Sequence, residues 1–202
     1  SGTQLMPAAR HVLTLFTALL LPVAVFAFSF ETDKHVKHEQ WSDEFDVYFK
    51  KYAKHYFGPH VDWHWFKAQG IAESNLNPKA RSHVGAKGIM QIMPATYDEI
   101  LKKNPHIPKT DEPRWNIAAG IFYDRMLYRK WKKKKTISTR ERLSFSFASY
   151  NAGLGTVLKA YKRASKKHGD IKQWEQVSGF APGETRFYVK RINNLMQTAS
   201  AK

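Results

Sequence analysis

Apolar residues recur at intervals of three and four along most of this chain, which is the spacing of helices that bury one face. The first such stretch after residue 30 runs from Phe45 to Tyr56, and Gly58-Pro59 ends it. Alternation with period two is brief, at Phe145 and Phe147, and its surroundings are helical. The chain is therefore predicted to be mostly α-helical.

Capping residues and helix stops divide the rest of the chain. Asp62 and Asn116 are expected to cap helices that follow them, and Gly169 is expected to end one. The predicted helices cover residues 62–75, 95–102, 116–131, 139–152, 156–167 and the stretch from 183 onward. Neither an internal repeat nor a Gly/Ser-rich or Pro-rich linker interrupts the 202 residues, which favours a single domain.

The N-terminal segment is typical of an export signal. No charged side chain occurs from Val12 to Phe30, Arg10 precedes this run, and Val25-Phe26-Ala27 resembles a small-residue cleavage site. Residues 1–27 are therefore predicted to be a signal peptide that precedes a domain at 28–202. An uncleaved membrane anchor formed by residues 12–30 is the alternative, because a bilayer needs about 20 apolar residues. The domain is expected in the periplasm or cell wall.

The chain has no cysteine, which excludes a disulfide framework, a thiolate zinc site and a cysteine nucleophile. Its formal charge is +16, and residues 1–27 contribute only Arg10, so an exported domain would carry +15. This excess indicates an anionic partner. Export favours an acidic membrane surface or wall polymer over nucleic acid, and the basic run at 129–135 comes with no nucleic-acid-binding motif. The paired histidines lack a third ligand, so neither a metal nor another cofactor is predicted.

One carboxylate is isolated in the sequence. No other Asp or Glu occurs between Glu73 and Asp98, and Glu73 lies near the end of a predicted helix that carries Trp65 and Gln69 on the same face. Burial and the negative end of the helix dipole would both raise its pKa toward the range of a general acid, whereas the nearby cations Lys79, Arg81 and Lys87 would lower the pKa if they pointed inward. Taken alone, the pattern favours a capping or salt-bridging glutamate, because structural ion pairs are common.

A Gly- and Met-containing segment from Gly85 to Pro94 follows. Glycines at such positions let the backbone approach a ligand closely. The segment is not a phosphate-binding loop, because it lacks a following GK[ST] and a preceding strand.

Four motifs in order resemble the family 1 lytic transglycosylases, the group that includes the soluble lytic transglycosylases. They are Glu73-Ser74 with GAKGIMQIMPAT at 85–96, NIAAG at 116–120, SYNAG at 149–153 and ETRFYVKRI at 184–192. The third motif has Ser149 where the family's element begins with Ala. The motifs extend over residues 60–195, so the resemblance covers nearly the whole predicted domain.

The resemblance implies a lysozyme-like fold of the goose-type/lytic transglycosylase kind, consisting of a single domain. It also implies cleavage of the MurNAc–GlcNAc bond of peptidoglycan without water, which leaves 1,6-anhydroMurNAc ends. Glu73 would be the sole acid/base, with the Tyr188 hydroxyl beside it. The isolation of Glu73 agrees with this role, although Asp62, Asp98, Asp124 or Glu184 could fold back toward it.

The same resemblance assigns substrate-binding roles. Ser74 would form a hydrogen bond near Glu73, Ser82 would orient the substrate, and Met90 would offer apolar surface to the sugars. The other residues expected to line the cleft are Gly88, Gln91, Tyr150 and Asn151.

Two alternatives stay open at this point. One is a muramidase-type hydrolase on the same fold, and the other is a non-catalytic module that binds the cell wall. Peptidoglycan strands are the expected partner in each case, and a monomer is expected.

Overall fold

Within residues 33–197, which are those that the computed structural model describes, eight helices are present and strands are absent. Two isolated β-bridges, Arg81 with Lys87 and Lys87 with Ile92, are the only extended pairings among these residues. The helices are α2 (Asp46–Phe57), α3 (His64–Ser74), α4 (Pro94–Lys103), α5 (Pro113–Trp131), α6 (Thr139–Ala152), α7 (Leu154–His168), α8 (Glu175–Ser178) and α9 (Gly183–Met196). The predicted mostly helical fold is confirmed.

Most helix ends agree with the local signals in the sequence. Ser138 accepts a hydrogen bond from the backbone N–H of Glu141 and so caps α6. The helices α2, α6 and α7 are each followed by a glycine with positive φ, namely Gly58, Gly153 and Gly169. The Asp62 side chain accepts a hydrogen bond from the backbone N–H of His64 at 3.0 Å, in the turn that precedes α3.

The prediction that Asn116 caps the long helix was wrong. Helix α5 begins three residues earlier, at Pro113, whose missing N–H and fixed φ suit the first helical position. Asn116 thus lies inside the helix, where its side chain is buried. The short helix α8 was also missed, since four residues carry too little periodicity to be recognised.

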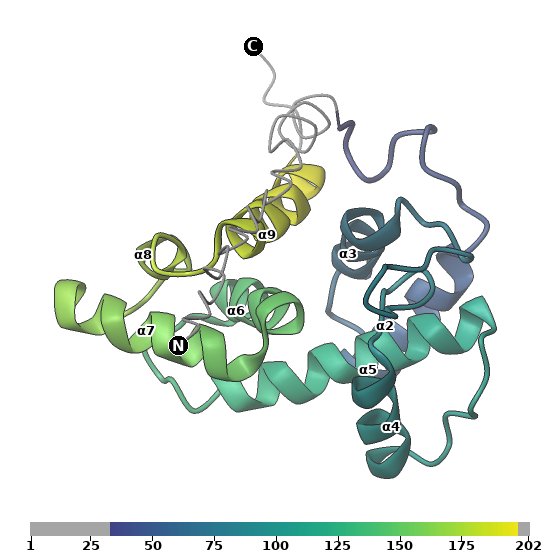
Figure 1. The fold of residues 1–202 in the computed structure, drawn as a ribbon. Helices are drawn as coiled ribbons and strands as arrows, with labels where there is room; N and C mark the ends of the chain where they lie inside the picture. The colour runs from purple at the N-terminus through teal and green to yellow at the C-terminus, as the bar shows by residue number, and fades with distance from the viewer. Residues whose placement is uncertain (1–32, 198–202) are drawn as a thin grey trace, which may run out of the picture. The chain divides into compact units, whose positions relative to one another are not determined.

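Figure 1 shows α5 extending between two groups of helices, with α2, α3 and α4 around its N-terminal half and α6 to α9 around its C-terminal end. It packs against both α2 and α6, and α3 packs against α9. The residues of α5 from Ile117 to Ile121 are fully or almost fully buried. Gly120 lets Met90 approach closely, because a Cβ on this glycine would come within 2.8 Å of the Met90 side chain.

None of the helices between residues 33 and 197 is both long and apolar enough to cross a membrane. The predicted signal peptide at 1–27, and the alternative anchor at 12–30, lie outside the described residues.

Candidate active site

Glu73 is the penultimate residue of α3, and two side chains anchor the helix end that carries it. The Ser74 hydroxyl donates to the backbone carbonyl of Ile89 at 2.8 Å, which ties α3 to the loop at 85–93. Arg191 of α9 donates to the Ile71 carbonyl at 3.3 Å and to Asn75 Oδ1 at 2.9 Å. The position of Glu73 is therefore set by one loop and one distant helix.

The electrostatic surroundings of Glu73 favour its protonated form. Its side chain keeps some exposure to solvent, yet the loss of hydration among the surrounding atoms raises its pKa to about 8. The Tyr188 hydroxyl acts in the opposite direction and lowers this pKa, whereas the negative charge of Glu184 raises it. Burial is thus the main cause of the raised pKa of Glu73, and no cation among the described residues offsets it.

Tyr188 reaches Glu73 from α9. Its side chain is buried, and its hydroxyl makes no hydrogen bond of standard geometry with the described residues. It nevertheless lies close enough to Glu73 to act on its pKa, and the nearby Glu73 in turn contributes to raising the pKa of Tyr188, after burial as the largest cause. The polar tip of Tyr188 is therefore a buried group whose effect falls on the Glu73 carboxyl.

The loop at 85–93 is clamped onto α5 by Asn116. The Asn116 side chain accepts from the backbone N–H of Met90 at 2.8 Å and donates to the carbonyl of Lys87 at 3.0 Å. Gly88 lies directly over this amide with φ of +76°, and a Cβ there would come within 2.5 Å of Asn116 Nδ2. Gly88 is therefore required for the close approach of loop and helix, and no ligand is needed to explain it.

Gln91 also holds the loop from within. Its backbone is left-handed, with φ of 46°, and its side-chain amide donates to the carbonyls of Gly88 at 2.8 Å and Ala80 at 3.1 Å. Ser82 closes the preceding turn, because its hydroxyl accepts from the backbone N–H of Ala86 at 3.0 Å. Both side chains thus make contacts that shape the loop.

Tyr150 connects this loop to α6. Its hydroxyl donates to the Met90 carbonyl at 2.7 Å, and Glu73 contributes to the rise in the pKa of Tyr150, which is due mainly to burial. The Met90 side chain is fully buried, so the interpretation of Met90 as apolar surface for sugars does not hold. It fills the space above Gly120 instead.

Asn151, next to Tyr150, links α6 to α9. Its Oδ1 accepts from the hydroxyl of Thr185 at 2.8 Å, one turn before Tyr188. The structure therefore gathers Glu73, Tyr150 and Tyr188 in one place, and it surrounds them with residues that fix the supporting backbone.

The sequence allows four acidic residues to lie near Glu73, and two of them either act on the pKa of Glu73 or respond to its charge. Glu184, exposed in the first turn of α9, raises the pKa of Glu73. Asp124 is completely buried on α5, and the charge of Glu73 contributes to the rise in its pKa, which is mainly due to burial. Asp62 instead pairs with His64, with Oδ1 and Nδ1 2.6 Å apart.

Sequence reasoning missed the roles of Asn116, Arg191 and Asp124. The sequence indicates Asn116 only as a helix start, and Arg191 only as part of the motif at 184–192. Asp124 gave a usable signal, because it is an acid within the apolar stretch from Ile117 to Leu127.

The all-helical domain carries Glu73, a carboxyl with a raised pKa, at the end of α3, and its fold matches that of the lysozyme-like catalytic domain of a soluble lytic transglycosylase. The family model for the "Transglycosylase SLT domain" matches residues 48–173, well over half of the chain. The chain therefore belongs to the SLT transglycosylase domain family.

Individual proteins agree with this assignment. The chain is 32% identical over 142 residues to the membrane-bound lytic murein transglycosylase F of Serratia proteamaculans, covering 69% of this chain and 27% of that protein. It is 31% identical over 122 residues to the protein of the same name from Histophilus somni, covering 60% and 24%. The 70 kDa soluble lytic transglycosylase from Escherichia coli superposes with a TM-score of 0.61 at 27% identity, covering 78% of this chain and 24% of that chain. The chain thus spans about a quarter of the length of these relatives.

Proposed function

We propose that this domain is a lytic transglycosylase that cleaves the MurNAc–GlcNAc bond of peptidoglycan and leaves 1,6-anhydroMurNAc ends. The observation that carries the proposal is the pKa of about 8 at Glu73, which keeps this carboxyl protonated at neutral pH beside a tyrosine hydroxyl. A protonated carboxylic acid of this kind is what the departure of a glycosidic oxygen requires.

In the proposed reaction, Glu73 acts twice. It first donates its proton to the glycosidic oxygen, and the bond between C1 of MurNAc and this oxygen breaks. The resulting Glu73 carboxylate then takes the proton of the C6 hydroxyl on the same MurNAc, while the C6 oxygen forms a new bond to C1. Glu73 ends protonated, as it began, and no water is consumed. The Tyr188 hydroxyl favours the transient carboxylate, consistent with its lowering of the pKa of Glu73.

The surroundings of Glu73 support a mechanism with one carboxylate. Hydrolases that retain configuration place a second carboxylate about 5 Å away, and inverting ones place a base about 6.5–9.5 Å away. Asp124 has no exposed surface, so it cannot contact a sugar. Glu184 is exposed, and it is the residue that could activate water if the domain were a muramidase-type hydrolase.

The variant Glu184→Gln tests these two reactions on purified sacculi. A transglycosylase should keep releasing anhydro-ended fragments, which are lighter by one water than hydrated ones, as mass spectrometry would show. A hydrolase with Glu184 as base should lose about 100-fold or more of its rate. Hydrated ends alone from the wild type would overturn the proposal, and binding to sacculi without any release would favour the non-catalytic module.

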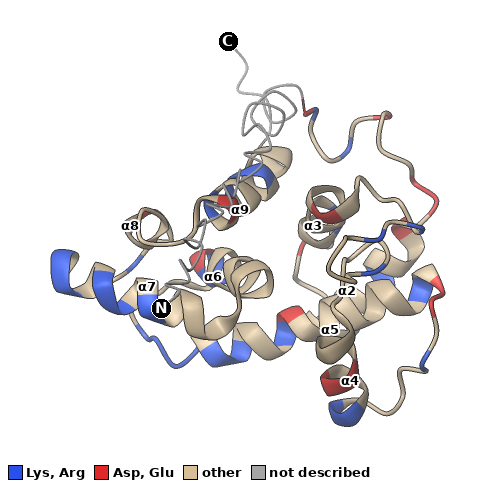
Figure 2. Cartoon of the chain, in the orientation of Figure 1, with Lys and Arg blue, Asp and Glu red and all other residues tan. Residues whose placement is uncertain are grey.

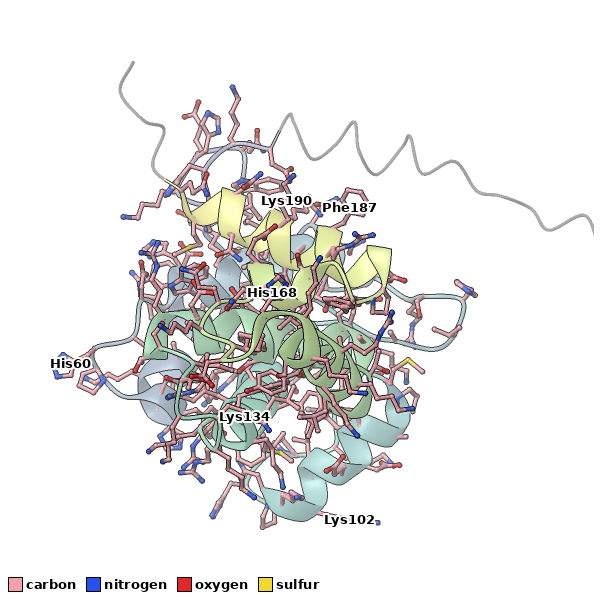
Figure 3. All side chains as sticks on the ribbon, turned by 90° about the vertical axis from the view of Figure 1, so that its left-hand side faces the viewer. His60, Lys102, Lys134, His168, Phe187 and Lys190 are labelled. Atoms are coloured by element: carbon pink, nitrogen blue, oxygen red, sulfur yellow. The ribbon has the colours of Figure 1, made fainter. Side chains whose placement is uncertain are left out.

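We further propose that the protein is exported and that its positive charge draws it to the anionic wall. We define the basic face as the loop Lys132 to Lys135 with the exposed cations of α7, namely Lys159, Lys162, Arg163, Lys166 and Lys167. The two parts adjoin, because Lys134 Nζ lies 4.6 Å from the ring centre of Tyr161 on α7. Figure 2 shows this concentration of blue along α7, and Figure 3 shows Lys134 on the same side as His168.

Reversing part of this charge should weaken binding to sacculi. The double variant Lys162→Glu/Lys166→Glu is expected to lower the affinity roughly tenfold at low ionic strength, and the difference should shrink in about 0.5 M salt. Co-sedimentation with sacculi measures both effects. Lys102→Glu/Lys103→Glu on α4 changes the net charge equally and should have the smaller effect. Equal losses in the two variants would mean that net charge, not the basic face, governs binding.

A further inference from the structure

The proposed reaction leaves Asp124, a buried carboxyl on α5, without a role. Gln69 Nε2 donates to Asp124 Oδ1 at 2.9 Å, and both side chains are completely buried. Gln69 lies four residues before Glu73, so the two share one face of α3. This hydrogen bond therefore fastens the helix that carries Glu73 to the central helix α5.

The hydrogen bonding of this pair is incomplete if Asp124 is ionised. Asp124 Oδ2 and Gln69 Oε1 are both buried, and neither has a partner among the described residues. The ion pairs of residues 33–197 include none with Asp124. A buried carboxylate without a cation, next to an orphaned amide oxygen, would be strongly unfavourable.

One proton resolves both deficits. A proton on Asp124 Oδ2 turns that oxygen into a donor, and Gln69 Oε1 is the buried acceptor left over on the residue that already binds Oδ1. An acid and an amide joined through two such bonds satisfy all four polar groups, which is how a buried polar pair becomes stabilising.

We propose that Asp124 is a positioning residue that functions as a neutral carboxylic acid, joined to Gln69 by two hydrogen bonds that hold α3 and Glu73 in place. Because the pair is neutral, it adds no second negative charge when Glu73 becomes a carboxylate during the reaction. The role in catalysis rests on the proposed function, whereas the neutral state of Asp124 does not.

The groups around the pair are consistent with a neutral acid. Burial raises the pKa of Asp124 well above its usual range, the hydrogen bond from Gln69 lowers it, and the charge of Glu73 raises it again. The other titratable groups that respond to the Asp124 charge are Tyr123 on α5, Tyr150 on α6 and Tyr188 on α9. None of these groups is a cation that would stabilise an ionised Asp124.

The variant Asp124→Asn tests the protonation state, because its amide can donate to Gln69 Oε1 and still accept from Nε2. A neutral Asp124 binds a proton in the folded state that the unfolded chain releases above about pH 4. The folding equilibrium constant of the wild type should therefore fall relative to that of the variant as the pH rises above about 5, by up to tenfold per pH unit. Urea denaturation at several pH values measures this ratio. A ratio independent of pH would show that Asp124 is ionised and would overturn the proposal.

Rates on sacculi test the positioning role. Asp124→Leu removes both hydrogen bonds and orphans Gln69, so kcat should fall at least tenfold with KM little changed, and Asp124→Asn should restore most of the loss. The upper apparent pKa of the Asp124→Asn rate profile should match that of the wild type, since no charge is removed. A decrease of a full unit in this apparent pKa would contradict the proposal, as would failure of Asp124→Asn to restore kcat. The denaturation result stands even if the leucine variant does not fold or the reaction differs from the one proposed.

Discussion

Glu73→Gln should reduce the release of soluble fragments from sacculi by at least about 100-fold, because the amide cannot deliver the proton that the leaving oxygen needs. The same variant should be more stable than the wild type at neutral pH. Folding holds a proton on Glu73 up to its pKa of about 8, whereas the unfolded chain releases it near pH 4.5. The ratio of the variant's folding equilibrium constant to that of the wild type should therefore rise tenfold per pH unit between these two values. It should stay constant above pH 8.

The pH–rate profile of the wild type adds a third readout. Since the first step needs protonated Glu73, activity should decline as the pH rises through about 8. Glu99→Gln on α4 provides the control, because it makes the same chemical change at an exposed position that forms an ion pair with Lys103. That control should keep the wild-type rate and the wild-type pH dependence of stability. Full activity in Glu73→Gln would remove Glu73 from the mechanism.

Asn116→Ala should produce the largest loss of stability among single changes near the site. The Met90 N–H and the Lys87 carbonyl lose their partner in a buried place, which costs about 2–4 kcal/mol for two orphaned groups. Activity should fall as well, because the Met90 carbonyl positions the Tyr150 hydroxyl. Urea denaturation and rates on sacculi measure the two effects.

Asn104→Ala is the matched control for this change. The Asn104 side chain also makes two hydrogen bonds, to Tyr56 and to the backbone of His106, but it lies at the end of α4 and neither bond involves the loop at 85–93. Its loss of stability should be smaller, and its rate should stay near that of the wild type. A normal rate in Asn116→Ala would show that the loop keeps its shape without the clamp.

The helical fold could be predicted because its signals are local. The spacing in α2, the cap at Ser138 and the glycine stops each involve residues within a few positions of one another. The sequence could suggest a raised pKa at Glu73 from its apolar helix, but the position of the nearby cations, which decides the direction, depends on the tertiary structure.

The rest of the site depends on contacts between distant residues. Asn116 binds a loop 26 and 29 positions away, and Gln69 binds Asp124 across 55 positions. A single sequence contains no signal for such pairings, which is why Asn116 was interpreted as a cap. The prediction that Met90 offers apolar surface to the sugars was wrong for a related reason. Its side chain fits over Gly120 of α5, and only the packing of loop on helix shows this.

The central claim is that Glu73 drives cleavage without water. Digestion of sacculi in ¹⁸O-labelled water, followed by mass spectrometry of the released fragments, tests it most directly. The proposed reaction predicts anhydro ends that contain no ¹⁸O, because the C6 oxygen of the sugar itself closes the bond to C1. New reducing ends that carry one ¹⁸O would show that water attacks C1, and they would contradict the account.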